Sequence, residues 1–253
     1  MLSSSRSTIH KTENGSPLLL PVLFKKRRYI VPMIKAALNS KQFLILEFIL
    51  LCIAVPGYII WTLSAAYMFG FLWGAALYCF VIYRYCMFPK GGWKEIWNWS
   101  AVNKETMKPL LMKWVLASLG MIVFIYFYDP DRMFYIVYNR PEMIPFLLVA
   151  YPLISALPQE FIFCSFFFNR YEKFFGRAAK MIWASAIIFA YAHILYINPV
   201  APTLSLVGGL IFAHNYAKHR SLALVSIEHG LYGNVLFIIG LGWYFYSGSV
   251  ATG

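Results

Sequence analysis

Three apolar stretches of the chain carry ionisable side chains at depths where lipid tails would surround them. These side chains are Glu160, His193 and His229. Ionisable groups inside a membrane are costly and usually functional. A carboxylate with two imidazoles suits the activation of water, because one group takes the proton while another steadies the oxyanion. The sequence therefore predicts a hydrolytic site made of these three residues, with Glu228 as a further deep carboxylate.

Other intramembrane chemistries need residues that the sequence lacks. A zinc metalloprotease of the site-2 type needs an HExxH motif, and none occurs. An aspartyl protease needs two buried aspartates, but Asp129 and Asp131 fall in a predicted outer loop. For a rhomboid-type serine protease, only Ser247 at the outer edge comes close. The three candidate residues could also hold a metal, although ligands from three separate spans have no diagnostic spacing. We expect no metal and no cofactor.

The composition is that of a membrane protein. Of 253 residues, 60% are apolar and only 13% are charged, against about 45–50% and about 25% in soluble domains. The mean hydropathy is +0.63. These values exclude a soluble enzyme, a disordered tail and a nucleic-acid-binding domain, in spite of the net charge of +12.

Hydropathy predicts an all-α polytopic membrane protein of about seven transmembrane helices, with six and eight as the limits. A crossing helix needs about 20 apolar residues. Residues 43–83 contain one charged side chain, Glu47, and are long enough for two crossings with a turn near Ser64–Ala65. The other predicted spans are Leu110–Tyr128, Ile144–Phe168, Met181–Ile197, Thr203–Ala217 and Leu222–Tyr246.

The basic residues predict the orientation. Of 22 lysines and arginines, 20 fall on one side of the predicted membrane, and only Arg132 and Arg140 fall on the other. Positive charge gathers on the cytoplasmic side, so the N-terminus is predicted in the cytoplasm and the C-terminus outside. The basic run Lys25–Arg28 is then a topology determinant that contacts anionic lipid, and we expect no nucleic-acid partner.

Two regions are expected. Residues 1–42 form a polar and basic cytoplasmic segment, partly interfacial, and residues 43–253 form a single multi-helix transmembrane domain. No cleavable signal peptide is evident. No internal repeat occurs, so the inverted repeat typical of a transporter is lacking.

Three ordered motifs in residues 144–246 resemble those of a known family. They are Gln159–Cys164 (QEFIFC), Phe189–His193 (FAYAH) and His229–Asn234 (HGLYGN). Order, spacing and helix placement are similar to E-E-x-x-x-R, F-x-x-x-H and H-x-x-x-N in the CAAX-protease and bacteriocin-processing (CPBP) family of glutamic intramembrane proteases. The resemblance, closest to bacterial members, implies seven or eight helices and a cavity open to the cytoplasmic side. It also implies endoproteolysis near the membrane, without a covalent intermediate or a metal, in a bacterial cytoplasmic membrane.

The sequence departs from the family pattern at three places. Gln159 stands where the family has its usual water-activating glutamate, and Cys164 stands where it has arginine. A glutamine can donate a hydrogen bond but cannot take a proton from water. Asn234 follows His229 by five residues instead of four, which turns it about 140° away on a helix, unless Gly230 and the glycine at 233 distort that helix.

The function that these residues favour is an intramembrane endopeptidase for a membrane-proximal peptide, which could be lipidated or secreted. Glu160 is the predicted base, His193 its partner and His229 the electrophile. Gln159, Asn234 and Glu228 are the candidate oxyanion or supporting residues. A catalytically silent scaffold or immunity protein remains the alternative, followed by a small-molecule transporter.

The orientation can be tested with topology reporters. A reporter fused after Arg177 should read cytoplasmic and one fused after Arg132 should read external, because 20 of 22 basic residues fall on the first side. Opposite readings at both positions would overturn the predicted orientation.

Overall fold

The computed structural model describes residues 31–245. The chain divides into two units, residues 1–40 and 41–253. In the first unit, residues 31–38 are helical. Most of the predicted N-terminal segment, including the basic run Lys25–Arg28, lies outside the described residues, and so does Ser247.

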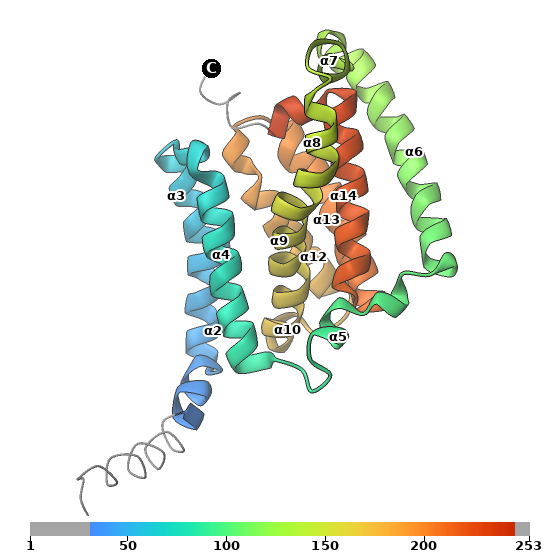
Figure 1. Ribbon diagram of the computed structural model, residues 1–253. Coiled ribbons are helices and arrows are strands. Elements are labelled where there is room, and N and C mark those ends of the chain that lie inside the picture. The colour runs from blue at the N-terminus through green and yellow to red at the C-terminus, as the bar shows by residue number, and fades with distance from the viewer. Residues whose placement is uncertain (1–30, 246–253) are drawn as a thin grey trace, which may run out of the picture. The chain divides into compact units, whose positions relative to one another are not determined.

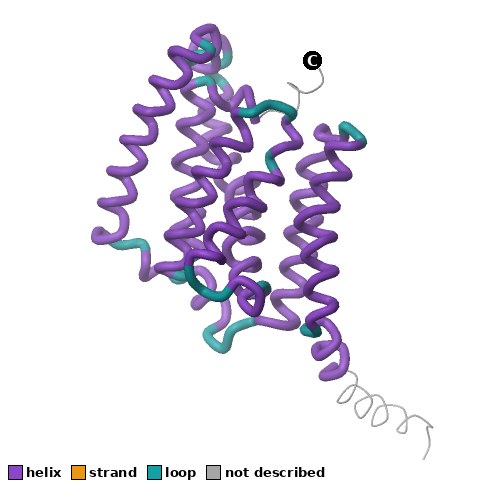
Figure 2. Tube along the Cα trace, turned by 180° about the vertical axis from the view of Figure 1, so that it is seen from behind, coloured by secondary structure: helices purple, strands orange, loops and turns teal. Residues whose placement is uncertain are grey.

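The second unit is built of helices, and no strand occurs among residues 41–245 (Figure 2). Its α-helices are α2 (Lys41–Phe48), α3 (Val55–Trp61), α4 (Met68–Ile82), α5 (Gly92–Trp97), α6 (Lys104–Tyr128), α7 (Tyr135–Asn139), α8 (Met143–Ala150), α9 (Leu157–Glu160), α10 (Phe167–Arg170), α11 (Glu172–Phe175), α12 (Ala179–Ala192), α13 (Val200–His219) and α14 (Leu222–Ile239). Wider π-helical turns join some of them: η1 (Ile49–Ala54), η3 (Tyr83–Met87), η6 (Tyr151–Ala156) and η7 (Phe161–Phe166). Short 3-10 turns are η2 (Ser64–Tyr67), η4 (Trp99–Ala101), η5 (Pro130–Arg132), η8 (Ile194–Tyr196) and η9 (Leu241–Phe245).

Six continuous helices of the described part are long and apolar enough to cross a membrane. They are Lys41–Trp61, Met68–Met87, Lys104–Tyr128, Met143–Arg170, Ala179–Tyr196 and Leu222–Ile239. This confirms the predicted all-α polytopic fold. The first two are separated at residues 62–67, where the sequence predicted the turn.

The sixth predicted span, Thr203–Ala217, corresponds to α13, which packs against α12. At about 1.5 Å per residue, its 20 residues match the roughly 30 Å of a hydrocarbon core. It is less apolar than the other six, because Thr203, Asn215 and Lys218 lie within it. Composition alone therefore does not mark it as a span.

The connections alternate between two ends of the bundle (Figure 1). The α5 and α10 segments lie at one end, and α7 lies at the other, with Arg132 and Arg140 just before and after it in the chain. At the α7 end, Val200 packs with Ile125 and Ile239 in a buried apolar cluster. The α7 end is therefore the one to which the basic residues assign the outside.

The fourth crossing helix is continuous but not uniformly α-helical. Pro152 and Pro158 lack an N–H group and interrupt the regular hydrogen-bond ladder. The π-helical turns η6 and η7 lie on either side of α9, which contains Gln159 and Glu160. Such turns often occur at functional sites, and these two set the directions in which the polar side chains of α9 point.

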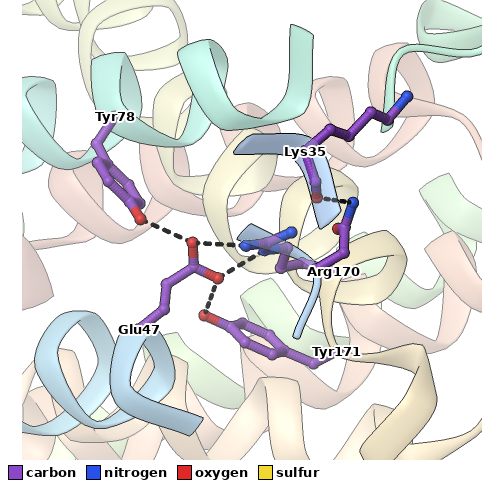
Figure 3. Close-up of polar contacts among 6 residues, drawn as sticks. Lys35, Glu47, Tyr78, Arg170 and Tyr171 are labelled. Atoms are coloured by element: carbon purple, nitrogen blue, oxygen red, sulfur yellow. Dashed lines mark hydrogen bonds and ion pairs between the residues drawn. The ribbon is translucent and has the colours of Figure 1, made fainter. Parts of the chain in front are cut away.

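A buried ion pair joins the first crossing helix to the fourth (Figure 3). The Glu47 carboxylate accepts hydrogen bonds from Arg170 Nε at 2.6 Å and Nη2 at 3.1 Å. Tyr78 and Tyr171 donate their hydroxyls to the same carboxylate at 2.7 and 3.3 Å. The side chains of Glu47 and Arg170 are each 1% exposed. Because every oxygen of the carboxylate is bonded, the charge inside the bundle is compensated.

Removing one member of this pair should destabilise the protein strongly. Arg170→Met leaves Glu47 buried without its counter-charge, and we expect a loss of about 3–5 kcal/mol in the free energy of unfolding, measured in detergent micelles. The exposed pair of Arg177 and Glu172, which is also 2.6 Å long, provides the control. There Arg177→Met should cost about 1 kcal/mol or less. Equal effects of the two substitutions would contradict the compensating role of Arg170.

Candidate active site

Glu160 and His229 form a direct hydrogen bond inside the bundle. Glu160 Oε1 lies 2.7 Å from His229 Nδ1, and the two side chains are 1% and 7% exposed. Glu160 is the last residue of α9, and His229 lies in the middle of α14. An ionised carboxylate can only accept, so Nδ1 carries the shared proton when Glu160 is charged. The structure thus joins two of the three predicted catalytic residues.

α14 is defined at both ends by its sequence. The Ser221 hydroxyl accepts the N–H of Leu224 at 3.0 Å and caps the first turn. Gly240 ends the helix with φ +108°, a conformation that glycine adopts without strain. The helix between these two residues is regular, so the position of His229 follows from how α14 packs.

Two glycines let α14 approach the fourth crossing helix closely. A Cβ atom on Gly230 would lie 3.1 Å from Pro152 Cβ, and one on Gly233 would lie 2.0 Å from Tyr151 Cε1. Side chains at both positions would push the two helices apart. These glycines do not distort α14, which is α-helical throughout. They allow close packing instead, and this packing brings His229 within reach of Glu160.

The second nitrogen of His229 contacts a tyrosine that no motif contains. The Tyr151 hydroxyl lies 2.9 Å from His229 Nε2. The Phe212 ring stacks on the imidazole with centroids 4.6 Å apart and planes 15° apart. The imidazole is therefore held at both nitrogens and on one face. Tyr151 lies nine residues before Glu160 in the same crossing helix, and the sequence contains no signal that marks it.

His193 lies at the C-terminal end of α12 and has a different partner. Its Nδ1 lies 2.7 Å from the carbonyl oxygen of Phe189. The Phe189 ring centroid is 4.6 Å from that of His193 and 5.7 Å from that of His229. Among the described residues, no hydrogen bond joins His193 to Glu160. The sequence predicted His193 as the partner of Glu160. In the structure, the hydrogen-bond partner of Glu160 is His229.

Both histidines line one large cavity of about 780 Å³. Gln159 and Tyr151 also line it, but Glu160 does not. None of its lining residues is Lys, Arg, Asp or Glu. A smaller cavity of about 140 Å³ adjoins it and shares Gln159 and His193. The large cavity reaches the surface of the bundle, because Phe146, which lines it, is 60% exposed.

The cavity lies in the half of the bundle nearer α7. Its lining residues on α6, α13 and α14 fall within 117–124, 204–212 and 229–237, so on each helix they are centred in the half nearer that end. The family resemblance implied a cavity open to the cytoplasmic side, whereas the basic residues place the α7 end outside. The two expectations do not agree for this cavity, and the reporter fusions described above decide between them.

Gln159 and Glu160 point in different directions, as their 100° separation on a helix requires. Gln159 lines the cavity, where its Nε2 donates to Ser155 Oγ at 2.9 Å. Gln159 Oε1 and Glu160 Oε2 are buried, and neither has a hydrogen-bond partner. Cys164, which stands where the family has arginine, is 2% exposed and brings no cation to Glu160. The next arginine, Arg170, bonds to Glu47 instead.

The other two predicted supporting residues do not line this cavity. Glu228 is fully buried and accepts both of its bonds from Asn215 Nδ2, at 2.8 and 2.7 Å. Asn234 Nδ2 donates to the Leu148 carbonyl at 3.4 Å. Because α14 is regular, the spacing of five residues keeps Asn234 off the face that carries His229.

Within residues 31–245, no group of three or more His, Cys, Asp or Glu side chains is placed to hold a metal ion. The four cysteines, all within the described residues, are unbridged thiols. The polar side chains that line the cavity carry imidazoles, an amide and hydroxyls. These groups can exchange protons and hydrogen bonds with a substrate.

Residues 141–245 match the family model described as type II CAAX prenyl endopeptidase Rce1-like. No curated protein and no solved structure gave a significant match to the chain. The matched segment contains all three motifs and supports a CAAX-type intramembrane protease at the level of the family. Over residues 141–245 the chain therefore matches the Rce1-like family of CAAX prenyl endopeptidases, which confirms the resemblance inferred from its motifs.

Proposed function

We propose that this integral membrane protein is an intramembrane endopeptidase in which His229, oriented by Glu160, activates water. The observation that carries the proposal is the buried 2.7 Å bond between these residues, next to a cavity that His229 lines and Glu160 does not. The match to the Rce1-like family supports a peptide or protein substrate. The resemblance to bacterial members supports a bacterial cytoplasmic membrane.

Glu160 is then a positioning residue, and His229 takes the role of base that the sequence predicted for Glu160. A water molecule in the cavity would meet His229 Nε2 before it could meet the buried carboxylate. A carboxylate that accepts from Nδ1–H fixes the imidazole in the tautomer whose other nitrogen is free to take a proton. It also stabilises the imidazolium that forms, as the aspartate does in a Ser-His-Asp triad.

The reaction balances with water as the only co-reactant. His229 Nε2 takes one proton of the water while its oxygen bonds to the scissile carbonyl carbon, giving a tetrahedral oxyanion. The C–N bond then breaks, and the proton on Nε2 passes to the leaving nitrogen. The products are a carboxyl group and an amine. Because the nucleophile is water, no covalent intermediate with the protein forms.

His193 is suited to orient the same water. Its Nδ1 must carry a proton to donate to the Phe189 carbonyl oxygen, so its Nε2 is an acceptor when the ring is neutral. A water that donates one proton to each histidine would be held in one orientation. His193 is then the second acceptor of the site and not the donor to the oxyanion.

The cavity favours an apolar substrate segment. Its lining contains no charged side chain, and burying an unpaired charge there would be very unfavourable. The cleaved bond is therefore expected within an uncharged, membrane-embedded or membrane-proximal stretch. Any charged part of the substrate would lie outside the cavity.

Glu160→Gln tests the proposal, because it keeps the size of the side chain and removes its charge. Membrane peptides that accumulate in cells carrying this variant, identified by mass spectrometry, would be the substrates. With such a peptide in proteoliposomes, the cleavage rate should fall about 10²–10⁴-fold. Glu172→Gln, which changes a half-buried carboxylate on α11 that does not line the cavity, should keep the wild-type rate. Full activity of Glu160→Gln would refute the role of Glu160, and unchanged peptides in every cell would favour the scaffold alternative.

Cleavage should also survive strong chelators. Glu160 is bonded to His229 and does not line the cavity, and among the described residues no group of three His, Cys, Asp or Glu side chains is placed to hold a metal ion. Purified protein treated with EDTA and then desalted should retain its rate. Stoichiometric zinc in the protein, lost on His193→Ala together with activity, would favour a metalloenzyme.

A further inference from the structure

We propose that Tyr151 is a further catalytic residue, whose hydroxyl donates a hydrogen bond to the oxyanion of the tetrahedral intermediate. This inference rests on the proposed function. Tyr151 belongs to none of the three motifs, and it lies in the π-helical turn η6, one residue after α8 ends.

The hydroxyl is the polar group closest to the reacting nitrogen. It lies 2.9 Å from His229 Nε2. When Glu160 accepts from Nδ1–H, Nε2 carries a lone pair, and the hydroxyl must be the donor. The hydroxyl proton of Tyr151 thus lies where the attacking water must place a proton in order to donate it to His229 Nε2. A water that bonds to Nε2 displaces this proton, and the hydroxyl is then free to donate nearby.

A carbonyl attacked from that position would place its oxygen close to the freed hydroxyl. A reactive arrangement needs a point about 3 Å from both the nucleophile and an oxyanion donor. Tyr151 meets this requirement, because its hydroxyl and a water bonded to His229 Nε2 would both lie next to that nitrogen. The donor is neutral and already positioned before substrate binds, which is the condition for effective stabilisation of an oxyanion.

The other candidate donors either donate elsewhere or form no hydrogen bond to His229. Gln159 Nε2 donates to Ser155, and His193 Nδ1 donates to a backbone carbonyl. Asn234 donates to the Leu148 carbonyl and does not line the cavity. The Tyr232 hydroxyl has no hydrogen-bond partner and contacts no histidine nitrogen. Tyr151 is therefore the donor that the geometry selects.

Gly233 is a second, independent sign that this position matters. A Cβ atom there would lie 2.0 Å from Cε1, 2.3 Å from Cζ and 2.4 Å from the hydroxyl oxygen of Tyr151. Any side chain at 233 would move the phenol away from His229. The Tyr151 ring also packs edge-on against Phe237, with centroids 5.1 Å apart. The ring is thus held in place by packing, and its hydroxyl is left for hydrogen bonding.

Tyr151→Phe is the decisive variant, because it removes only the hydroxyl. With the peptide identified through Glu160→Gln, the purified full-length variant in proteoliposomes should lose about 10²–10³-fold in kcat. Its KM should stay within a few-fold of wild type, because the bond forms only in the transition state. A packing role alone would not produce this separation, since the phenyl ring is kept.

Gly233→Ala tests the same contact from the other helix. It should also lower kcat. A Cβ atom at 233 also pushes α14 away from the fourth crossing helix and so weakens the bond between Glu160 and His229. Gly233→Ala therefore tests the packing, whereas Tyr151→Phe tests the hydroxyl alone. An unchanged kcat in Gly233→Ala would count against the proposal.

The control is Tyr244→Phe. It removes a hydroxyl that donates to Asp129 at 2.6 Å, and it does not line the cavity. This variant should keep the wild-type kcat. If Tyr151→Phe keeps full kcat while Glu160→Gln is inactive, the inference fails and the proposed function stands. A larger loss in Tyr232→Phe than in Tyr151→Phe would also overturn it. If no peptide depends on Glu160, the proposed function fails and this inference fails with it.

Discussion

The hydrogen bond between Glu160 and His229 is the constraint on which the site depends. A carboxylate and an imidazole in the middle of a bundle lose their hydration, and only a direct bond can offset that loss. The bond is 2.7 Å long and nearly inaccessible. It requires α14 to pack closely on the fourth crossing helix, and Gly230 and Gly233 provide the room. The cavity, the orientation of the imidazole and the contact with Tyr151 all follow from that packing.

Two of the three buried carboxylates among the described residues, Glu47 and Glu160, differ in what their oxygens contact. Both oxygens of Glu47 are bonded to a guanidinium or a tyrosine hydroxyl. Such a network holds helices together and leaves no atom for chemistry. Glu160 instead bonds to His229, whose imidazole lines a large cavity. This connection to a cavity distinguishes the site from the structural ion pair of Glu47 and Arg170.

The presence of Gln159 where the family has glutamate is consistent with a site in which the carboxylate does not face the cavity. Gln159 lines the cavity, and an amide there neither takes a proton nor adds a charge to an uncharged lining. The one carboxylate that remains lies behind His229. The proton acceptor that faces the cavity is then an imidazole, which is the base under the proposed function.

Residue types and hydropathy determined much of this protein without a structure. The spans, the turn near 64–65 and the three polar positions on separate helices depend on local composition, which the membrane makes decisive. The rotation of Asn234 away from His229 also followed from spacing alone. Tertiary structure decided which groups meet: His229 instead of His193 on Glu160, Arg170 on Glu47 across 123 positions of sequence, and Tyr151 on His229. These contacts depend on how each helix rotates about its axis and how closely it packs, and the rotation and packing are set by side chains on neighbouring helices that lie far away in the sequence.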